Sequence, residues 1–450
     1  MDGLEQAIKA INGPINSVVW GWPTVILIAI TGFVLMIGLR FMPLQRLGYG
    51  VSMMFRPSEA ENDGEITPFQ ALMTSLSATI GTGNIAGVAG AIAIGGPGAV
   101  FWMWVIAIFG IATKYAEAVL AVQFRQTDAE GNHVGGPMYY IRNGLGSGWS
   151  WMAGLFALFG MLAGFGIGNG VQAFEVSSAL SLIGVPKLVT GVVLAALVFA
   201  VVIGGIRRIA QAASAIVPLM SLLYVGACLL VLILNIGSVP EAFATIFSNA
   251  FSGKAAAGGA LGQVVLMGFK RGIFSNEAGL GSAPIAHAAA KTDDPVRQGT
   301  VAMLGTFIDT LVICTMTALV IITTQAHLLT NAAGDRLSGA DLSIAAFNAG
   351  LSGSGVVVTV GLVIFAFTTI LGWSFYGERC TTYLFGDAAV LPFRLVWVAV
   401  VVIGAVAGDR GVIWSVADTL NGLMALPNLV ALLLLSGTVF RLSKEHHFDS

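Results

Sequence analysis

The feature that most constrains the fold is a strongly apolar segment interrupted by glycine, at residues 75–97 (SLSATIGTGNIAGVAGAIAIGGP). It belongs to a stretch apolar enough to cross a bilayer, yet it contains four glycines, Gly81, Gly83, Gly87 and Gly90. Each glycine costs a helix interior about 1 kcal/mol relative to alanine. Opened backbone inside a membrane is tolerated only where it lines a cavity or is buried in protein. The segment therefore predicts a broken membrane helix whose exposed N–H groups face an anionic ligand group.

A second segment has the same character. Residues 274–286 read FSNEAGLGSAPIA, in which Asn276 and Gly279 repeat the spacing of Asn84 and Gly87. Paired glycine-interrupted hydrophobic segments in the two halves of a chain indicate the binding site of a transporter. The alternative interpretation is that the glycines only let membrane helices pack closely.

Composition places the whole chain in the membrane. Of its 450 residues, 56% are hydrophobic and 10% are charged, whereas soluble domains average about 25% charged residues. The net charge of −2 and the absence of a basic tract give no indication of a nucleic-acid partner. The three cysteines fall in or beside apolar segments without metal-ligand spacing, and the first residues lack the basic region of a signal peptide. We therefore expect an all-α integral membrane protein without a soluble domain.

Hydropathy predicts eleven spans, at residues 18–41, 68–95, 99–124, 151–183, 188–204, 209–236, 259–290, 301–327, 356–382, 390–407 and 412–440, with a short helix at 341–349. Basic residues concentrate in the loops after the odd-numbered spans and in the C-terminal tail. This distribution predicts an outer N-terminus and a cytoplasmic C-terminus. The expected division is an extra N-terminal helix with a cytoplasmic linker (1–66), two five-helix repeats of opposite topology (67–236 and 237–440) and a tail (441–450).

Several long motifs resemble the alanine or glycine:cation symporter family. They are SLSATIGTGNIAGVAGAIAIGGPGAVFWMW, KYAEAVLAVQFR, GGPMYYI and GFKRGIFSNEAGLGSAPIAHAAA, within a resemblance that covers about residues 69–440. The resemblance implies a LeuT-type fold, an inverted repeat of ten core helices of which the first and sixth are broken. It implies import of alanine or glycine coupled to sodium by alternating access, in the plasma membrane of a prokaryote. Coupling to protons, or another amino acid or a nucleobase as substrate, is the alternative. We expect no organic cofactor and no obligatory protein partner.

The resemblance also implies substrate contacts. The substrate carboxylate would bind the backbone of residues 79–83, which include Thr79, Gly81, Thr82 and Gly83, and the ammonium would bind carbonyls near Ile273 and Ser275. Four further candidates come from their own chemistry, and each has a structural alternative. They are Gln172, an amide that needs a partner on another helix or in the pocket; Asn276, a helix cap or a substrate contact; Trp373, a pocket wall or an interfacial anchor; and Phe174, a pocket or lipid-facing ring.

For sodium, the resemblance implies a site made of backbone carbonyls and two hydroxyl groups. The carbonyls belong to Ser77, Ile80 and Phe365, and the hydroxyls to Thr368 and Thr369. Such hard oxygen ligands suit the ion, although threonine also commonly bonds to its own helix. A second sodium site would need Asn84 and Ser275.

Five ionisable residues fall within apolar spans, and such residues are candidates for function. They are Lys114, Glu117, Glu175, Glu277 and Asp309. Lys114 and Glu117 are spaced to pair on one helix face or to bind opened backbone, whereas Glu277 could serve proton coupling or gating. Two other classes are considered: a membrane serine hydrolase, from the short G-x-S-G match at residues 350–353, and a channel.

Overall fold

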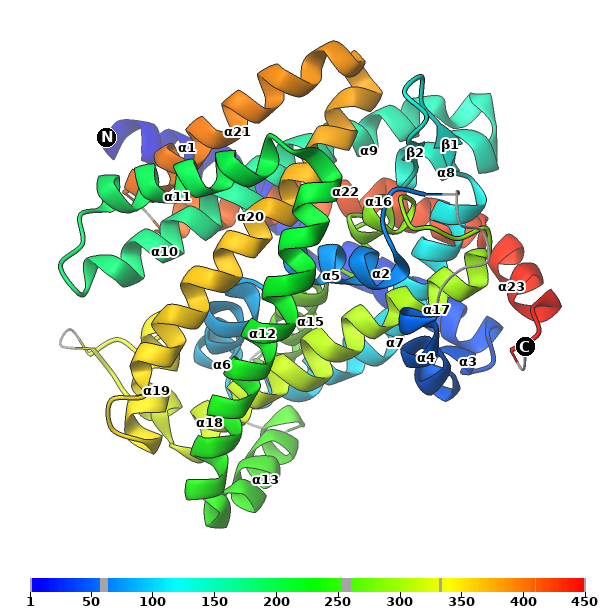
Figure 1. Ribbon diagram of the computed structural model, residues 1–450. Helices are drawn as coiled ribbons and strands as arrows, with labels where there is room; N and C mark the ends of the chain where they lie inside the picture. Colours follow the sequence, from blue (N-terminus) through cyan, green and yellow to red (C-terminus); the bar gives the residue numbers. More distant parts are fainter. Residues whose placement is uncertain (1, 57–63, 252–259, 332–333, 409, 449–450) are drawn as a thin grey trace.

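The computed structural model describes residues 2–56, 64–251, 260–331, 334–408 and 410–448 (Figure 1). Within these residues the only strands are β1 (Gln126–Thr127) and β2 (His133–Val134), which form an antiparallel hairpin. Everything else is helix or connecting loop. The chain is therefore an all-α protein, as predicted.

Eight helical segments of the described residues are long and apolar enough to cross a membrane, and a bent pair supplies a ninth. Their elements are α1 (Asp2–Val19) with α2 (Trp22–Gly38), α7 (Ala99–Gln123), α9 (Ser150–Ala163) with η3 (Gly164–Gly170) and α10 (Val171–Ser181), α12 (Gly205–Leu234), α17 (Pro295–Thr306) with η5 (Phe307–Cys314) and α18 (Thr315–Thr323), α20 (Gly355–Phe385), α21 (Val390–Val406), and α22 (Arg410–Leu434). The other two predicted spans correspond to α11 (Lys187–Val202), which is short, and to a segment split into α15 (Ala260–Asn276) and α16 (Ala283–His287). The total of eleven spans stays a prediction.

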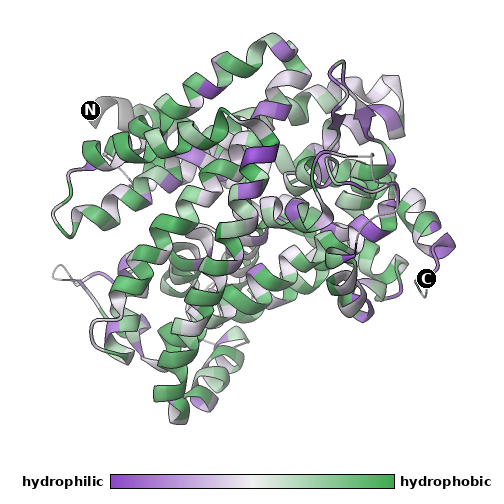
Figure 2. Ribbon diagram, viewed as in Figure 1, coloured by the Kyte–Doolittle hydropathy of each residue, from purple (hydrophilic) through white to green (hydrophobic). Residues whose placement is uncertain are grey.

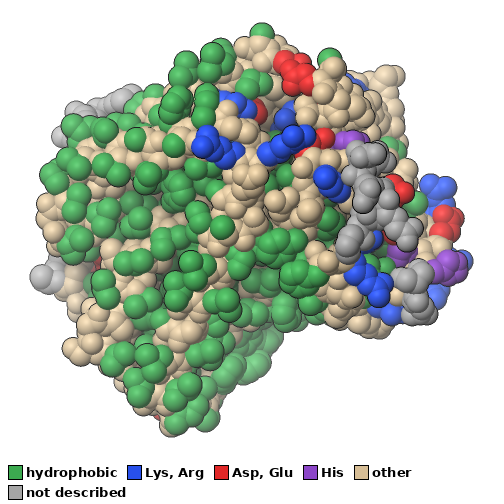
Figure 3. All heavy atoms as spheres, in the orientation of Figure 1, with side chains coloured by type: hydrophobic (Ala, Val, Ile, Leu, Met, Phe, Trp, Pro, Cys, Tyr) green, Lys and Arg blue, Asp and Glu red, His purple; other side chains and the backbone are tan. Residues whose placement is uncertain are grey.

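Short helices connect these segments. They are α3 (Met42–Gln45), α4 (Leu47–Phe55), α8 (Pro137–Leu145), η2 (Ser147–Trp149), η4 (Ile236–Ser238), α13 (Val239–Ala250), η6 (Ala326–Leu328), α19 (Gly339–Gly350), η7 (Asp387–Ala389) and α23 (Ser436–Glu445). The predicted helix at 341–349 is therefore present as α19. Hydrophobic residues dominate the long helices in Figure 2, and hydrophobic side chains cover the face around α12 and α20 in Figure 3. That surface suits contact with lipid.

The first helix break occurs between α5 (Pro68–Thr79) and η1 (Gly83–Gly87), which continues into α6 (Val88–Gly95). Ile80 has an extended backbone (ψ 93°), and the two halves of the span are bent by 52°. The N–H of Gly81 is then bound by the Oδ1 atom of Asn84 at 2.9 Å, so a side chain replaces the lost helical partner. The predicted first break is confirmed.

The second break lies between α15 and α16. Glu277, Gly279 and Gly281 adopt φ angles of +58°, +89° and +81°, a region that interrupts a right-handed helix. Glycine enters this region without steric cost, which explains two of the three positions. The second break predicted from the sequence is therefore also present.

The N-terminal segment differs from the expectation of one span at 18–41, because helix α1 already begins at Asp2. Two of its amides bind α22, Asn12 to Ser415 Oγ at 2.7 Å and Asn16 to Thr419 Oγ1 at 2.9 Å. The polar residues that hydropathy assigns to a leading loop are therefore satisfied by another helix.

Candidate functional site

The first break is tied to α10 by an amide. Gln172 Oε1 accepts the N–H of Thr82 at 3.3 Å, and its Nε2 donates to the carbonyl of Ile167 at 2.9 Å. The Thr82 hydroxyl is wholly buried and has no hydrogen-bond partner among the described residues. Gln172 therefore faces opened backbone, beside a hydroxyl that is free to bind a ligand.

The five residues predicted to bind sodium are distributed over α5, its C-terminal end and α20, two helices that pack against each other. Thr369 Oγ1 donates to the carbonyl of Ile80 at 3.3 Å, and Thr368 Oγ1 donates to the carbonyl of Phe365 at 2.9 Å. Ser77 lies close to α20, since a Cβ added to Gly372 would be 2.6 Å from its Oγ. The packing of α5 against α20 thus brings together carbonyl and hydroxyl oxygens, which could hold a hard cation.

The carboxylate of Asp309, in η5, links the two breaks. Its Oδ1 accepts from Asn84 Nδ2 at 2.7 Å, and its Oδ2 accepts from Ser275 Oγ at 2.9 Å and Thr310 Oγ1 at 2.7 Å. Asp309 is fully buried. From the sequence, Asp309 is only an ionisable residue in an apolar span, and nothing there associates it with Asn84 and Ser275.

The second break is held by Glu117 of α7. One carboxylate oxygen accepts the N–H groups of Gly279 and Gly281 at 3.1 and 3.0 Å, and Asn428 Nδ2 at 2.7 Å. The Nζ atom of Lys114 has no hydrogen-bond partner within the described part of the chain. Of the two interpretations of this pair, Glu117 binding opened backbone is the one observed.

The remaining substrate candidates, Trp373, Asn276 and Phe174, have different surroundings. Trp373 is fully buried and donates its indole N–H to Glu277 at 2.8 Å, so it is not an anchor at the membrane surface. Asn276 acts as a local cap, because its Oδ1 accepts the N–H of Ala278 at 2.9 Å and its Nδ2 donates to Thr310. Phe174 lies instead beside Lys187, whose Nζ is 5.3 Å from the ring centroid.

The backbone positions expected to bind substrate lie close to one another. A Cβ added to Gly83 would be 3.3 Å from the Cα of Ser275, so glycine allows the two breaks to approach. The carbonyl of Ile273 accepts the N–H of Glu277 at 2.8 Å, and the Thr79 hydroxyl bonds back to Ser75 at 3.3 Å. The hydroxyl of Thr79 is thus turned to its own helix.

A cavity of about 250 Å³ lies beside the first break and is lined in part by Gly87, Gly90 and Arg271. Trp414 and Glu175 also line it, and Trp414 Nε1 donates to Glu175 Oε1 at 2.8 Å. The Trp414 ring stacks on Phe274, with centroids 4.9 Å apart. Because Phe274 also lies against Gly83, this aromatic pair separates the cavity from the meeting point of the breaks.

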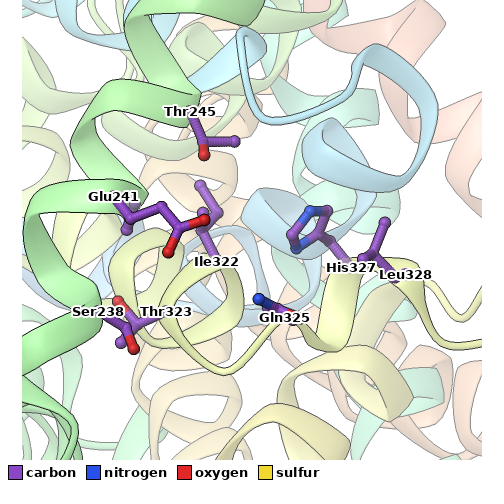
Figure 4. A pocket seen from close by; sticks show the side chains of 9 residues that line it. Ser238, Glu241, Thr245, Ile322, Thr323, Gln325, His327 and Leu328 are labelled. Carbon is purple, nitrogen blue, oxygen red and sulfur yellow. The ribbon is translucent and has the colours of Figure 1, made fainter.

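A second cavity, of about 220 Å³, contains none of the predicted site residues (Figure 4). Glu241, Thr245, Thr323 and His327 are among its lining residues, from α13, the end of α18 and η6. Burial lowers the pKa of His327. The cavity is therefore formed by connecting segments and the end of α18, away from the two helix breaks.

The sequence profile of the sodium:alanine symporter family matches residues 5–449. The chain is 51% identical over 429 residues to the sodium/alanine symporter AgcS of Methanococcus maripaludis, covering 94% of each protein. It is 38% identical over 446 residues to a probable sodium/glutamine symporter, GlnT of Bacillus subtilis, covering 98% of this chain and 91% of GlnT.

Among solved structures, MhsT in complex with L-phenylalanine matches with a TM-score of 0.59 at 13% identity, over 85% of this chain and 99% of MhsT. That likeness shows the LeuT-type fold. The family consists of symporters, which excludes the hydrolase and channel alternatives. The chain belongs to the sodium:alanine symporter family.

Proposed function

We propose that the chain imports a small neutral amino acid, alanine or glycine, together with sodium. The observation that carries the proposal is the meeting of two helix breaks around Gly83 and Ser275, with the buried carboxylate of Asp309 beside them. Family membership supports coupling of amino-acid transport to sodium, and the relative with 51% identity is described as a sodium/alanine symporter.

A zwitterionic substrate needs donors for its carboxylate and acceptors for its ammonium at close range. Opened backbone would supply both, as N–H groups at residues 81–83 and carbonyls at residues 273–275. In this structure the side chains of Asn84 and Gln172 accept the N–H groups of Gly81 and Thr82, and a substrate carboxylate would take their place. The free hydroxyl of Thr82 and the amide of Gln172 lie at the same position and add polar contacts. The small size of the substrate is set by Trp373, one turn beyond Thr369 on α20.

Two groups of oxygen atoms could bind sodium. The first consists of the carbonyls of Ser77, Ile80 and Phe365 with the hydroxyls of Thr368 and Thr369. The second consists of Asn84 and Ser275, now joined by the Asp309 carboxylate. The first group would bind sodium through neutral carbonyl and hydroxyl oxygens. The second group would bind it through the negative charge of the Asp309 carboxylate, which the first group lacks.

Transport would proceed by alternating access around this fixed site, in a prokaryotic plasma membrane with the N-terminus outside and the C-terminus cytoplasmic. The Phe274–Trp414 pair would close the outer side. On the inner side, Arg125 binds the carbonyls of Ala288, Ala290 and Thr292 at 3.1, 2.9 and 2.5 Å. These bonds fix the end of α16, and they must break or move when the inner side opens.

The test is uptake of labelled alanine into proteoliposomes that contain the purified protein. Accumulation should require an inward sodium gradient and should fail with potassium in its place. Equal uptake without any cation gradient, and no accumulation with one, would contradict the proposal. Accumulation driven fully by a pH gradient would assign the coupling to protons. Strong competition by glutamine, the substrate named for GlnT, would favour a larger substrate.

A further inference from the structure

We propose that Glu277 is a positioning residue that sets the size limit of the substrate pocket by holding Trp373 in one orientation. The inference rests on the proposed function, because it assigns a cause to the selection of small substrates. It concerns an acid that neither the substrate contacts nor the sodium groups require.

The backbone conformation of Glu277 is unfavourable for a residue with a side chain, which indicates that this side chain has a role at this position. Its φ of +58° lies in the left-handed region, which costs a residue with a Cβ atom more than it costs glycine. The other two left-handed positions in this break, 279 and 281, are glycines. A glutamate at such a position is retained only where the surrounding structure compensates the strain.

The compensation comes from the two carboxylate oxygens. Oε1 accepts the indole N–H of Trp373 at 2.8 Å, and Oε2 accepts the hydroxyl of Ser282 at 2.5 Å. Glu277 and Ser282 are each 1% exposed, and Trp373 is fully buried. Each carboxylate oxygen of this buried side chain therefore has a hydrogen-bond donor, and in a buried site such bonds are costly to lose. The second break is therefore fastened to α20 through the indole ring.

The opposite side of the Trp373 indole is fixed by close packing. A Cβ added to Gly168 would lie 2.2 Å from Trp373 Cβ, and one added to Gly164 would lie 3.7 Å from Cε3. The rings of Tyr376 and Trp373 lie at 71° to each other, with centroids 5.6 Å apart. The indole is thus confined between η3 on one side and Glu277 at its N–H.

The same π-helical segment η3 leads directly into Gln172, whose amide bonds Ile167 and the first break. Because η3 packs on Trp373 and precedes Gln172, a rotation of Trp373 would displace the segment that positions the Gln172 amide at the first break. Without Glu277 the buried indole N–H would lose its acceptor, and the ring would turn to find another. The pocket would then admit side chains larger than a methyl group.

The test measures competition by valine and leucine against labelled alanine in proteoliposomes, at saturating sodium and with uptake normalised to inserted protein. Glu277→Gly removes the carboxylate and relieves the backbone strain, so we expect valine to compete at least tenfold better relative to alanine. Glu277→Gln keeps an oxygen that accepts the indole N–H, and the order of preference should remain that of the wild type.

Glu117→Gln is the matched control, because Glu117 is a buried acid on the same break that does not contact Trp373. It should lower uptake without changing the order of preference. Trp373→Phe leaves Glu277 intact but removes the N–H, and it should shift the preference in the same direction as Glu277→Gly. The two changes combined should add little to either alone, since both break one interaction.

A Glu277→Gly or Trp373→Phe variant that responds to sodium and keeps the wild-type order of preference would overturn the inference. Additive shifts in the double variant would do the same. If the wild-type protein does not transport alanine, the proposed function is refuted instead, because alanine is then not the substrate against which valine and leucine should be compared.

Discussion

Gly81 lies between Thr369, a predicted sodium ligand, and Gln172, a predicted substrate contact. A methyl group added at Gly81 should therefore disturb sodium binding and substrate binding together. A Cβ at this residue would lie 2.5 Å from Thr369 Oγ1 and 3.3 Å from Gln172 Oε1. The optimal separation of non-bonded heavy atoms is at least about 3.5 Å, so the Thr369 hydroxyl must move by about 1 Å. Thr369 is 1% exposed and packed within α20, so it has little space in which to move.

The expected cost of Gly81→Ala follows from overpacking, which costs about 1–3 kcal/mol in a well-packed interior. Since about 1.4 kcal/mol corresponds to a factor of ten, sodium affinity should fall by about 5- to 140-fold. Because ligand linkage is reciprocal, alanine affinity at fixed sodium should fall as well. The assay is sodium-dependent binding of labelled alanine to purified protein, titrated with sodium.

Gly90→Ala is the control for Gly81→Ala. It lies in the same broken span, but its added Cβ would meet no atom within 4 Å. It should leave the sodium dependence at the wild-type value. In the double variant Gly81→Ala with Thr369→Ala, the clash is relieved, so the combined loss should be smaller than the sum. Wild-type sodium dependence in a folded Gly81→Ala protein would refute this reasoning.

Three further predictions test other parts of the site. Thr369→Val should weaken sodium binding more than Thr368→Val, because only Thr369 reaches the carbonyl of Ile80 on the first break; equal effects in sodium titrations would contradict this. Asp309→Asn should lower the apparent sodium affinity at least tenfold, by analogy with the about 1.5–3 kcal/mol of a hydrogen bond to a charged group; an unchanged titration would exclude Asp309 from cation binding. Arg125→Ala should raise amide hydrogen exchange at residues 288–292, since three carbonyls lose their donor; unchanged exchange there would show that these bonds do not hold the inner side closed.

The helix breaks were predictable from the sequence because their cause is local. Glycine clusters in an apolar segment interrupt a helix wherever the segment folds, and both breaks occur where Gly81–Gly83 and Gly279–Gly281 indicated. The LeuT-type fold followed from long motifs and is confirmed. Helix α1 was missed because hydropathy treats Asn12 and Asn16 as loop residues, whereas partners on α22 satisfy them.

The side-chain pairings of the site could not be predicted, since they join positions far apart in the chain. Asp309 meets Asn84 across 225 positions, and Trp373 meets Glu277 across 96. An acid in an apolar span signals that some partner exists, but its identity depends on how η5 packs between the two breaks. The same limit applies to Phe174, which shares a helix with Gln172 yet contacts Lys187.

The contact between α1 and α22 has a consequence for how the protein is made. The amide of Asn12 and its partner Ser415 are separated by 403 positions, and Trp20 donates to the carbonyl of Asp418 across 398. At a synthesis rate of about 5–20 residues per second, the N-terminal helix precedes its partner by about 20–80 s. Throughout that interval its amides must stay hydrated at the membrane surface, because hydrocarbon offers them no partner. Helix α1 thus reaches its final position only after α22, made much later, has entered the membrane.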